Sequence, residues 1–556
     1  MDVQPSSSLN AVTRADAVGR LRASTQRPLD LLVIGGGVTG CGALLDAAAR
    51  GLDAVLVERT DLAGGTSSRS SRLAHGGLRY LEHFEFGLVH EALTERGLLL
   101  DRLAPHLVQP VPFLFPVTRQ WERPYTGAGI ALYDTLSRLG AYGGAMPRPK
   151  ALSKQAVLGM APGMREDAFH SAVRFYDAQI DDARHTVAVA RTAAEHGAGV
   201  VTRAGVTGLI IADDRVVGAW VDVDGERIEV RARVVLGAVG PWTDELMRLA
   251  DPDHEPVLRP SKGSHLVVDR SAFVSACALI ARTPTSVLFA LPWGRRWLVG
   301  TTDTQYDEDP AGVRADDADV EYLLDQANRW FQRPLSPDDV LGVYSGVRPL
   351  VTEQGAQATA TLSREHVVFR PLPGLLTIAG GKYTTYRVMA KDAVDAVMSE
   401  GDFPAVACTT DDIPLAGAQD FYEMWAARDH LAGEAGLSVD VMEGLLRRHG
   451  GHVGYVLDLM KQDPLLAERI DPGAGYVLAE AVAAVEREAA ATLADIAMRR
   501  TRVALEVGDG GALAAGRIGD VLVRYFDTDP DEVAQQTRDL LEQPNTLLCA
   551  HVTSAG

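Results

Sequence analysis

One glycine-rich segment constrains the fold of this chain more than any other feature. An apolar run at 29–34 predicts a buried strand that ends in Gly35-Gly36-Gly37-Val38-Thr39-Gly40, from which an alanine-rich helix is expected to reach Arg50. A second apolar strand at 54–57 then finishes at Glu58. Glycines in this pattern let the backbone approach a pyrophosphate, the helix N-terminus favours its negative charge, and the carboxylate accepts hydrogen bonds from ribose hydroxyls. The segment therefore predicts a Rossmann-type strand–helix–strand unit that binds a dinucleotide.

A carboxylate at this position suits NAD and FAD equally, so the choice between them depends on two other segments. The loop at 66–71, Thr-Ser-Ser-Arg-Ser-Ser, offers hydroxyls to a second phosphate and to a flavin. A late buried strand at 374–378 leads to Gly380-Gly381-Lys382, and the helix after it would direct backbone N–H groups at the pyrimidine end of an isoalloxazine. Both segments favour non-covalent FAD. The expected cofactor-binding residues are Gly35, Gly37, Gly40, Glu58, Thr66, Ser67, Ser68, Ser71, Gly240, Trp242, Gly380, Gly381, Lys382 and Thr384.

The charge balance limits the partners of the chain. Its net charge of −20 argues against nucleic acid as the main partner and against a broad polybasic membrane patch. An anionic substrate must therefore be held by a few concentrated Arg and Lys side chains.

The cysteine pattern and the absence of long apolar runs bear on location. The cysteines lie far apart and form no CxxC pair, which favours a reduced cytoplasmic protein over a disulfide framework or a zinc site; they are Cys41, Cys277, Cys408 and Cys549. No metal is expected. The sequence also lacks a signal peptide and an apolar run of about 18 residues, so we expect any membrane contact to be peripheral.

Seven segments together resemble the FAD-dependent glycerol-3-phosphate dehydrogenases. They lie at 35–40, 66–71, 75–83, 262–265, 300–303, 346–349 and 380–387. The resemblance spans roughly residues 28–545 in order and includes Met498-Arg499-Arg500-Thr501-Arg502 near the end. The segments at 75–83 and 380–387 are specific to this family, whereas the glycine motif is shared with many flavoproteins.

The resemblance implies an α/β fold of three parts. These are a Rossmann-type FAD-binding domain of the glutathione-reductase and D-amino-acid-oxidase kind, a substrate domain with an antiparallel sheet, and a C-terminal all-α domain. With the strand and helix patterns it places a flexible leader at 1–27, the FAD-binding domain at 28–95, 176–256 and 360–404, the substrate domain at 96–175 and 257–359, the helical domain at 405–545 and a tail at 546–556.

The resemblance also implies partners. Family members oxidise glycerol 3-phosphate to dihydroxyacetone phosphate, act as homodimers, and rest on the inner face of the cell membrane to reach a quinone. Here the stretch 119–139, where the family tends to have a basic and apolar membrane-dipping element, holds Trp121 and Tyr125 but also Glu122 and Asp134. We therefore expect weak to moderate attachment to the membrane surface.

The chemistry of the reaction suggests the substrate residues. A secondary alcohol loses a hydride to flavin N5 and a proton to a base, while its phosphate needs Arg forks or a Lys point charge. For the base, His265 opens a predicted strand and is preferred over His75. By family likeness the substrate is surrounded by Arg79, Tyr80, His265, Arg348 and Lys382, with Asp303 orienting a site group; His265, His75, Arg348 and Lys382 are the expected catalytic residues.

Three alternative functions remain open on the sequence. The first is an oxidase of the same substrate that hands electrons to oxygen. The second is an amine or amino-acid oxidase of the same fold, which would need one Arg for a carboxylate and an apolar pocket rather than several cations. The third is a flavin-binding sensor or scaffold that has lost catalysis; the complete set of competent side chains argues against it.

Overall fold

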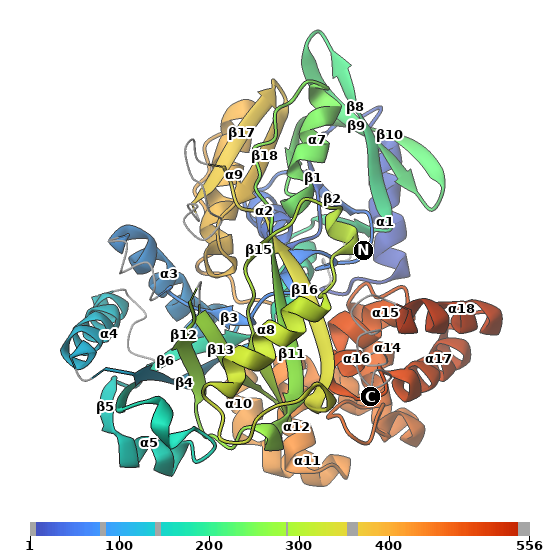
Figure 1. The fold of residues 1–556 in the computed structure, drawn as a ribbon. Helices are drawn as coiled ribbons and strands as arrows, with labels where there is room; N and C mark the ends of the chain where they lie inside the picture. The colour runs from blue at the N-terminus through green and yellow to red at the C-terminus, as the bar shows by residue number, and fades with distance from the viewer. Residues whose placement is uncertain are drawn as a thin grey trace.

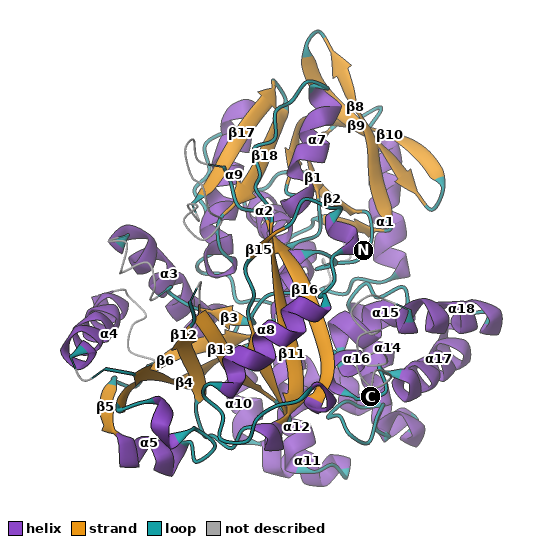
Figure 2. Ribbon diagram, viewed as in Figure 1, coloured by secondary structure: helices purple, strands orange, loops and turns teal. Residues whose placement is uncertain are grey.

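The computed structural model describes residues 7–77, 85–119, 121–139, 146–284, 287–352 and 365–542. Two β-sheets and a group of C-terminal helices make up this part of the chain (Figures 1 and 2). The first sheet has the order β17-β18-β10-β1-β2-β7, and the pairings among β18, β10, β1, β2 and β7 are parallel. This arrangement confirms the predicted α/β fold class.

The first sheet follows from the apolar runs in the sequence. Its strands are β1 (Leu29–Ile34), β2 (Ala54–Glu58), β7 (Gly199–Thr202), β10 (Glu226–Gly237), β17 (His366–Leu372) and β18 (Leu375–Gly380), and the hairpin of β8 (Ala204–Ala212) and β9 (Arg215–Val223) extends it from β10. Strands β1 and β2 are almost wholly buried, as expected of parallel strands covered on both faces. Helices α2 (Val38–Ala49), α6 (Asp182–Glu195) and α9 (Tyr386–Glu400) pack on one another beside this sheet.

The second sheet has the order β15-β11-β14-β13-β12-β4-β6-β3, with β16 on β11 and β5 on β6. Its strands are β3 (Leu73–Ala74), β4 (Val108–Val117), β5 (Lys150–Ser153), β6 (Ser171–Ile180), β11 (Ser261–Asp269), β12 (Ala278–Arg282), β13 (Val287–Trp293), β14 (Arg296–Gly300), β15 (Thr304–Gln305) and β16 (Val340–Arg348). All its pairings are antiparallel except that of β12 with β4. Strand β6 runs to Ile180, so the expected boundary at 175/176 falls inside a strand of this sheet.

Within the expected leader at 1–27, where the sequence also allows a short helix around 11–21, the structure has a helix packed on the first sheet. This helix, α1 (Ala11–Ala23), begins at a capping box on Asn10 and buries Ala17, Val18 and Leu21. The four-residue spacing of Ala17 and Leu21 gives it one apolar stripe.

Helices make up most of the chain from Phe421 to Leu541. They are α10 (Phe421–Ala426), α11 (Arg428–Ala435), α12 (Val439–His449), α13 (Val453–Gln462), α14 (Leu478–Arg487), α15 (Leu493–Asp495), α16 (Val503–Glu506), α17 (Ala512–Phe526) and α18 (Pro530–Leu541). In Figure 1 this group lies against the lower right of the two sheets. The longer helices outside it are α3 (Phe86–Leu98), α4 (Glu122–Leu139), α5 (Lys154–Met160), α7 (Thr243–Ala250) and α8 (Asp317–Asn328). None of the described helices is long and apolar enough to span a membrane.

Buried ion pairs join the helical group to the sheets. Glu488 pairs with Arg184 of α6 at 2.5 Å, and both side chains are at most 5% exposed. Burial by itself would raise the pKa of Glu488, but the charges of Arg184 and His449 outweigh it and lower that pKa to about 2. The carboxylate is thus held ionised by its partners, and it carries part of the contact between the helical group and α6.

The lowered pKa of Glu488 predicts how the free energy of unfolding depends on pH. A carboxylate whose folded pKa lies below its unfolded value stabilises the fold fully above the ordinary carboxyl pKa of about 4.3, and loses this contribution as the pH falls toward about 2. Glu488→Gln should therefore cost about 3 kcal/mol at neutral pH, because it leaves Arg184 uncompensated. The difference in melting temperature between the two proteins should shrink below about pH 4. Circular dichroism melts across pH measure it, and a constant difference down to about pH 2.5 would contradict the assignment.

Candidate cofactor and substrate site

A large cavity of about 750 Å³ lies where strand ends of the first sheet meet β11 and β16 of the second. This volume lies in the upper part of the range of natural small-molecule sites and leaves room for a large cofactor beside a small substrate. The expected site residues that line it are Gly35, Gly37, Glu58, Thr66, Ser67, Ser71, His75, Gly240, Trp242, His265, Arg348, Gly380, Gly381, Lys382 and Thr384.

Five expected residues are not among those lining the cavity. Gly40, Ser68 and Asp303 lie beside it, whereas Arg79 and Tyr80 fall outside the described residues. Gly40 acts through packing, because a Cβ there would lie 2.0 Å from the Gly35 carbonyl oxygen. It thereby lets the first turn of α2 touch the end of β1.

The dinucleotide end of the cavity is built from backbone groups. Gly35 has φ +110°, and a Cβ on it would lie 2.6 Å from the Ala238 carbonyl oxygen, so the turn requires glycine. The Gly36 N–H donates to Glu58 Oε2 at 2.7 Å, and the Val38 N–H at the start of α2 donates to Ser67 Oγ at 2.9 Å. The carboxylate and the helix N-terminus are thus placed together at the cavity, as the motif predicts.

The other end of the cavity is closed by the turn after β18. Gly380 and Gly381 have φ of +80° and +77°, a conformation that other residues rarely adopt. The turn leads through Lys382 into Thr384, whose Oγ1 accepts from the His75 N–H at 3.0 Å and donates to the His75 carbonyl at 3.1 Å. These contacts hold the segment around His75 against the turn that carries Lys382.

Alternate residues of β11 and β16 form the wall on the substrate side. The register pairs Ser261 with Arg348, Gly263 with Gly346, and His265 with Tyr344. Because alternate residues of a strand share a face, all six lie on one side of the sheet. The glycine pair in the middle leaves room above the backbone for longer side chains from either end.

Arg348 uses that room. Its guanidinium lies over Gly263, where a Cβ would come within 2.3 Å of Nη2. Nη2 donates to Thr301 Oγ1 at 3.0 Å, and Nη1 lies 3.7 Å from Asp303 Oδ1. Asp303, which accepts a hydrogen bond from the Ser261 hydroxyl, therefore helps to hold Arg348 in place. Asp303 is not among the residues that line the cavity.

His265 is held flat against its neighbours. Its ring stacks on that of Tyr344 at 4.7 Å between centroids with 7° between the planes, and Nε2 lies 2.9 Å from Ser71 Oγ. A Cβ on Gly300 would lie 2.3 Å from Cδ2 of the ring. Burial, followed by the positive charges of Arg348 and Arg72, lowers the pKa of His265 to about 3. The ring is therefore neutral at physiological pH.

Sequence reasoning missed the residues that shape this wall. Tyr344, Gly263 and Gly300 set the place of His265 and Arg348, but none was expected in the site. A signal was present for Tyr344, because it precedes Gly346 and Arg348 by two and four residues in one strand. Gly300 belongs to another strand, β14, so only the register of the sheet reveals its role.

The geometry fits FAD. The glycine turn and the start of α2 suit a pyrophosphate, and Trp242, which lines the cavity, has a buried Nε1 with no hydrogen-bond partner among the described residues. The turn at Gly380–Gly381 and the wall of β11 and β16 stand at the cavity beyond this cradle. One cavity thus holds features for a dinucleotide and, beside them, Arg348, Lys382, His75 and His265.

Comparisons with known proteins agree with this geometry. Residues 30–387 match the family of FAD-dependent oxidoreductases, and residues 408–533 match the C-terminal domain of alpha-glycerophosphate oxidase. The chain is 46% identical over 537 residues to glycerol-3-phosphate dehydrogenase of Mycobacterium leprae, covering 96% of this chain and 90% of that one. It is 44% identical to glycerol-3-phosphate dehydrogenase 2 of Mycobacterium tuberculosis, covering 93% and 88%.

A solved structure extends the likeness to the whole fold. The glycerol-3-phosphate dehydrogenase from Bacillus halodurans, complexed with FAD, superimposes with a TM-score of 0.79 at 29% identity, covering 97% of this chain and 98% of that one. The chain belongs to the family of FAD-dependent glycerol-3-phosphate dehydrogenases.

Proposed function

We propose that this protein oxidises sn-glycerol 3-phosphate to dihydroxyacetone phosphate and passes the electrons to a membrane quinone. The observation that carries the proposal is the joint presence of Arg348, Lys382 and His265 on the cavity that holds the dinucleotide cradle. The relatives named above as glycerol-3-phosphate dehydrogenases support the choice of substrate.

The cofactor residues divide along the cavity. The turn at Gly35–Gly37 with the start of α2 would hold the pyrophosphate, Glu58 the ribose, and the turn at Gly380–Gly381 the flavin. When bound, FAD supplies a hydride acceptor at N5 of its isoalloxazine. The protein must therefore bind the phosphate of the substrate and accept the proton of its hydroxyl.

Arg348 and Lys382 bind the phosphate. The guanidinium presents a planar fork that matches phosphate oxygens, and Lys382 adds a point charge from the neighbouring turn. Both work against a chain of net charge −20, so the attraction is local to the cavity. Because Asp303 and Thr301 fix the guanidinium beforehand, little side-chain freedom is lost on binding.

His265 accepts the hydroxyl proton. The imidazole ring is neutral at physiological pH, and its Nε2 forms a hydrogen bond with Ser71 Oγ. The other ring nitrogen, Nδ1, is buried without a hydrogen-bond partner among the described residues, so the proton would reach Nε2 through the hydroxyl of Ser71, which lines the cavity. The negative phosphate at Arg348 would raise the pKa of His265 toward its ordinary value and make the ring a better base. His75 lines the same cavity and is the alternative base.

The proposal of a membrane quinone rests on helix α4. Trp121, just before the helix, is 67% exposed, and within the helix Tyr125 is 61% exposed and Leu132 is also exposed. Aromatic and aliphatic side chains of this kind insert into the boundary region of a lipid surface. We infer peripheral attachment to the inner face of the cell membrane through this helix.

The phosphate role of Arg348 is tested by anaerobic reduction. Addition of glycerol 3-phosphate should bleach the yellow absorption of the bound flavin. Arg348→Ala should raise the concentration required by about 10- to 100-fold, the worth of a charge-assisted hydrogen bond. Arg329→Ala, at an exposed arginine just after α8, is the control and should leave the titration unchanged. Bleaching in Arg348→Ala at the wild-type concentration would remove Arg348 from the phosphate site.

The role of His265 is tested by stopped-flow kinetics. His265→Ala should lower the limiting rate of flavin reduction by about 100-fold or more, while the substrate concentration giving half that rate changes far less. His75→Ala, measured in parallel, should retain most of the rate. Equal losses of rate and of affinity would make His265 a binding residue, and a larger loss in His75→Ala would assign the base to His75.

The electron acceptor is tested by reoxidation. Enzyme reduced with glycerol 3-phosphate should be reoxidised by a soluble quinone analogue at least about 100-fold faster than by dissolved oxygen. The match to the C-terminal domain of an alpha-glycerophosphate oxidase makes oxygen the competing candidate. Rapid reoxidation by oxygen with release of peroxide would replace the dehydrogenase proposal with an oxidase. Small amino acids serve as the control substrates and should not reduce the flavin.

A further inference from the structure

The segment 495–502 of the C-terminal helices has an unusual backbone. Residues Ile496–Arg500 form one π-helical turn, closed by the Thr501 N–H donating to the Ile496 carbonyl at 2.9 Å. Arg502 follows with φ +69°, in the left-handed region that costs a residue with a side chain about 1 kcal/mol or more. Such departures persist only where surrounding contacts over-determine them, and they gather at functional sites. The contacts of this segment therefore need an explanation.

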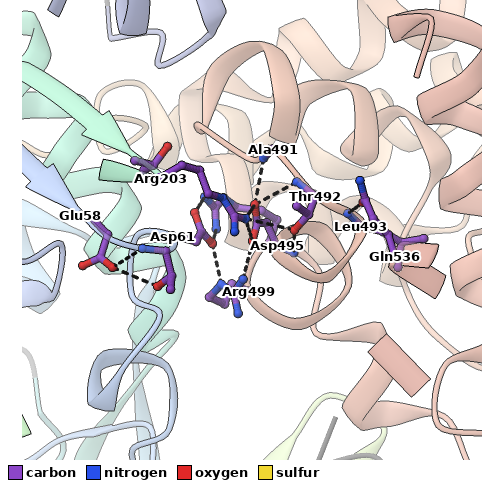
Figure 3. Close-up of polar contacts among 12 residues, drawn as sticks. Glu58, Asp61, Arg203, Ala491, Thr492, Leu493, Asp495, Arg499 and Gln536 are labelled. Carbon is purple, nitrogen blue, oxygen red and sulfur yellow. Dashed lines mark hydrogen bonds and ion pairs between the residues drawn. The ribbon is translucent and has the colours of Figure 1, made fainter. Parts of the chain in front are cut away.

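The first contacts of this segment are hydrogen bonds to Asp61, just after Glu58. Arg500 donates from Nη1 and Nη2 to both oxygens of Asp61, at 2.9 Å and 2.8 Å, and Arg499 Nε donates to the same carboxylate at 2.5 Å. Figure 3 shows Arg499 between Asp61 and Asp495, with Glu58 close to Asp61 at the end of its strand. The helical group thus holds the start of the loop that runs from Glu58 along the cavity.

Arg502 contacts the other end of the same loop, at Ser68 and, through Asp182, at Ser70. Its side chain is 1% exposed, and Nη1 donates to the Ser68 carbonyl at 2.8 Å. Nη2 donates to Asp181 at 3.1 Å and to Asp182 Oδ1. The second oxygen of Asp182 accepts from the backbone N–H and the hydroxyl of Ser70, at 3.1 Å and 2.7 Å. Arg502 therefore fixes Ser68 directly and Ser70 through Asp182.

Ser70 connects this clamp to His265 in two ways. The Ser70 carbonyl accepts from the hydroxyl of Tyr344 at 3.0 Å, and the ring of Tyr344 stacks on His265. The next residue, Ser71, places its hydroxyl 2.9 Å from His265 Nε2. A shift of Ser70 would therefore move both the ring behind His265 and the hydroxyl that sets its tautomer.

We propose that Arg502 of the C-terminal helical group is a positioning residue for the oxidation step, acting on His265 through Asp182 and the loop 66–71. It touches neither the cavity nor the substrate. The proposal rests on the proposed function for the role of His265, but the arrangement of the flavin-side loop can be measured without any substrate.

A purely structural role is the competing explanation, because removing one partner of any buried ion pair destabilises a protein. Arg448 provides the matched control. It is largely buried, and its side chain pairs with Glu480 at 2.5 Å and donates to the Gly475 carbonyl at 3.0 Å, both within the helical group. Its backbone carbonyl, which accepts from Arg184, is kept in the variant. Loss of Arg448 should therefore lower stability as much as loss of Arg502, without reaching the loop.

The experiment compares four purified holoenzyme variants with wild type. They are Arg502→Met, Arg502→Lys, the double variant Arg502→Met with Asp182→Asn, and Arg448→Met. Three quantities are measured below the lowest melting temperature: the visible circular dichroism of bound FAD, the limiting rate of anaerobic reduction by glycerol 3-phosphate, and the substrate concentration giving half that rate. The double variant removes Arg502 together with Asp182, its closest carboxylate, and so leaves less uncompensated charge than Arg502→Met alone; it can be studied even if Arg502→Met does not fold.

We expect Arg502→Met to alter the dichroism of the flavin and to lower the limiting rate by about ten-fold or more, with the half-saturating concentration within about three-fold of wild type. Arg502→Lys should recover part of the rate, because lysine restores the charge at Asp182 but not the fork that reaches Ser68. The double variant should fold and remain slow. Arg448→Met should match wild type in dichroism and rate despite a lower melting temperature.

Two results would overturn the proposal. One is a wild-type rate and spectrum in Arg502→Met or in the double variant. The other is an equal loss in Arg448→Met, which would show that the rate follows stability alone. If glycerol 3-phosphate does not reduce the wild-type flavin, the proposed function fails, and the dichroism of the same variants still decides whether Arg502 sets the flavin-side loop.

Discussion

The whole site depends on how closely the start of α2 can approach the end of β1. Gly35 and Gly40 bring a helix N-terminus and a strand end within contact distance, and a side chain at either position would collide with backbone. This contact directs the N-terminus of α2, the positive end of a helix dipole, at one point of the cavity. A dinucleotide can lie along the cavity only because that point is fixed. The wall of β11 and β16, with Arg348 and His265, then faces the same space.

The second constraint is how the arginine side chains are paired with carboxylates. The chain carries a net charge of −20, yet several of its arginines are buried, among them Arg184, Arg500 and Arg502, each against a carboxylate. Arg348, by contrast, lines the cavity, where its Nη1 lies 3.7 Å from Asp303 Oδ1. The buried arginines are thus neutralised by carboxylates at short range, whereas the guanidinium of Arg348 stands on the cavity wall.

Features that depend on neighbouring residues could be predicted from the sequence, whereas contacts between residues far apart in the chain could not. The βαβ unit, the turn at Gly380–Gly381 and the strand that carries His265 follow from patterns within short windows, whereas the pairing of that strand with the strand of Arg348 does not. The role of Gly300 and that of Asp182 could not be read in this way, because each depends on partners in other elements. Asp303 belongs to the same class: its motif was noticed, but its contact with Arg348 appears only in the fold. Arg79 and Tyr80 lie outside the described residues and stay predictions.

The contacts of Leu9, which precedes α1, affect how the protein folds during its synthesis. Leu9 exchanges backbone hydrogen bonds with Arg487 and Ala489, at 3.1 Å and 2.8 Å, next to the carboxylate of Glu488 that pairs with α6. Leu9 must therefore wait for partners that leave the ribosome much later in synthesis. Contacts of such sequence separation form late and slowly. The helical group can complete this contact only after residues 487–489 have been made, so nascent chains remain open at this place until then.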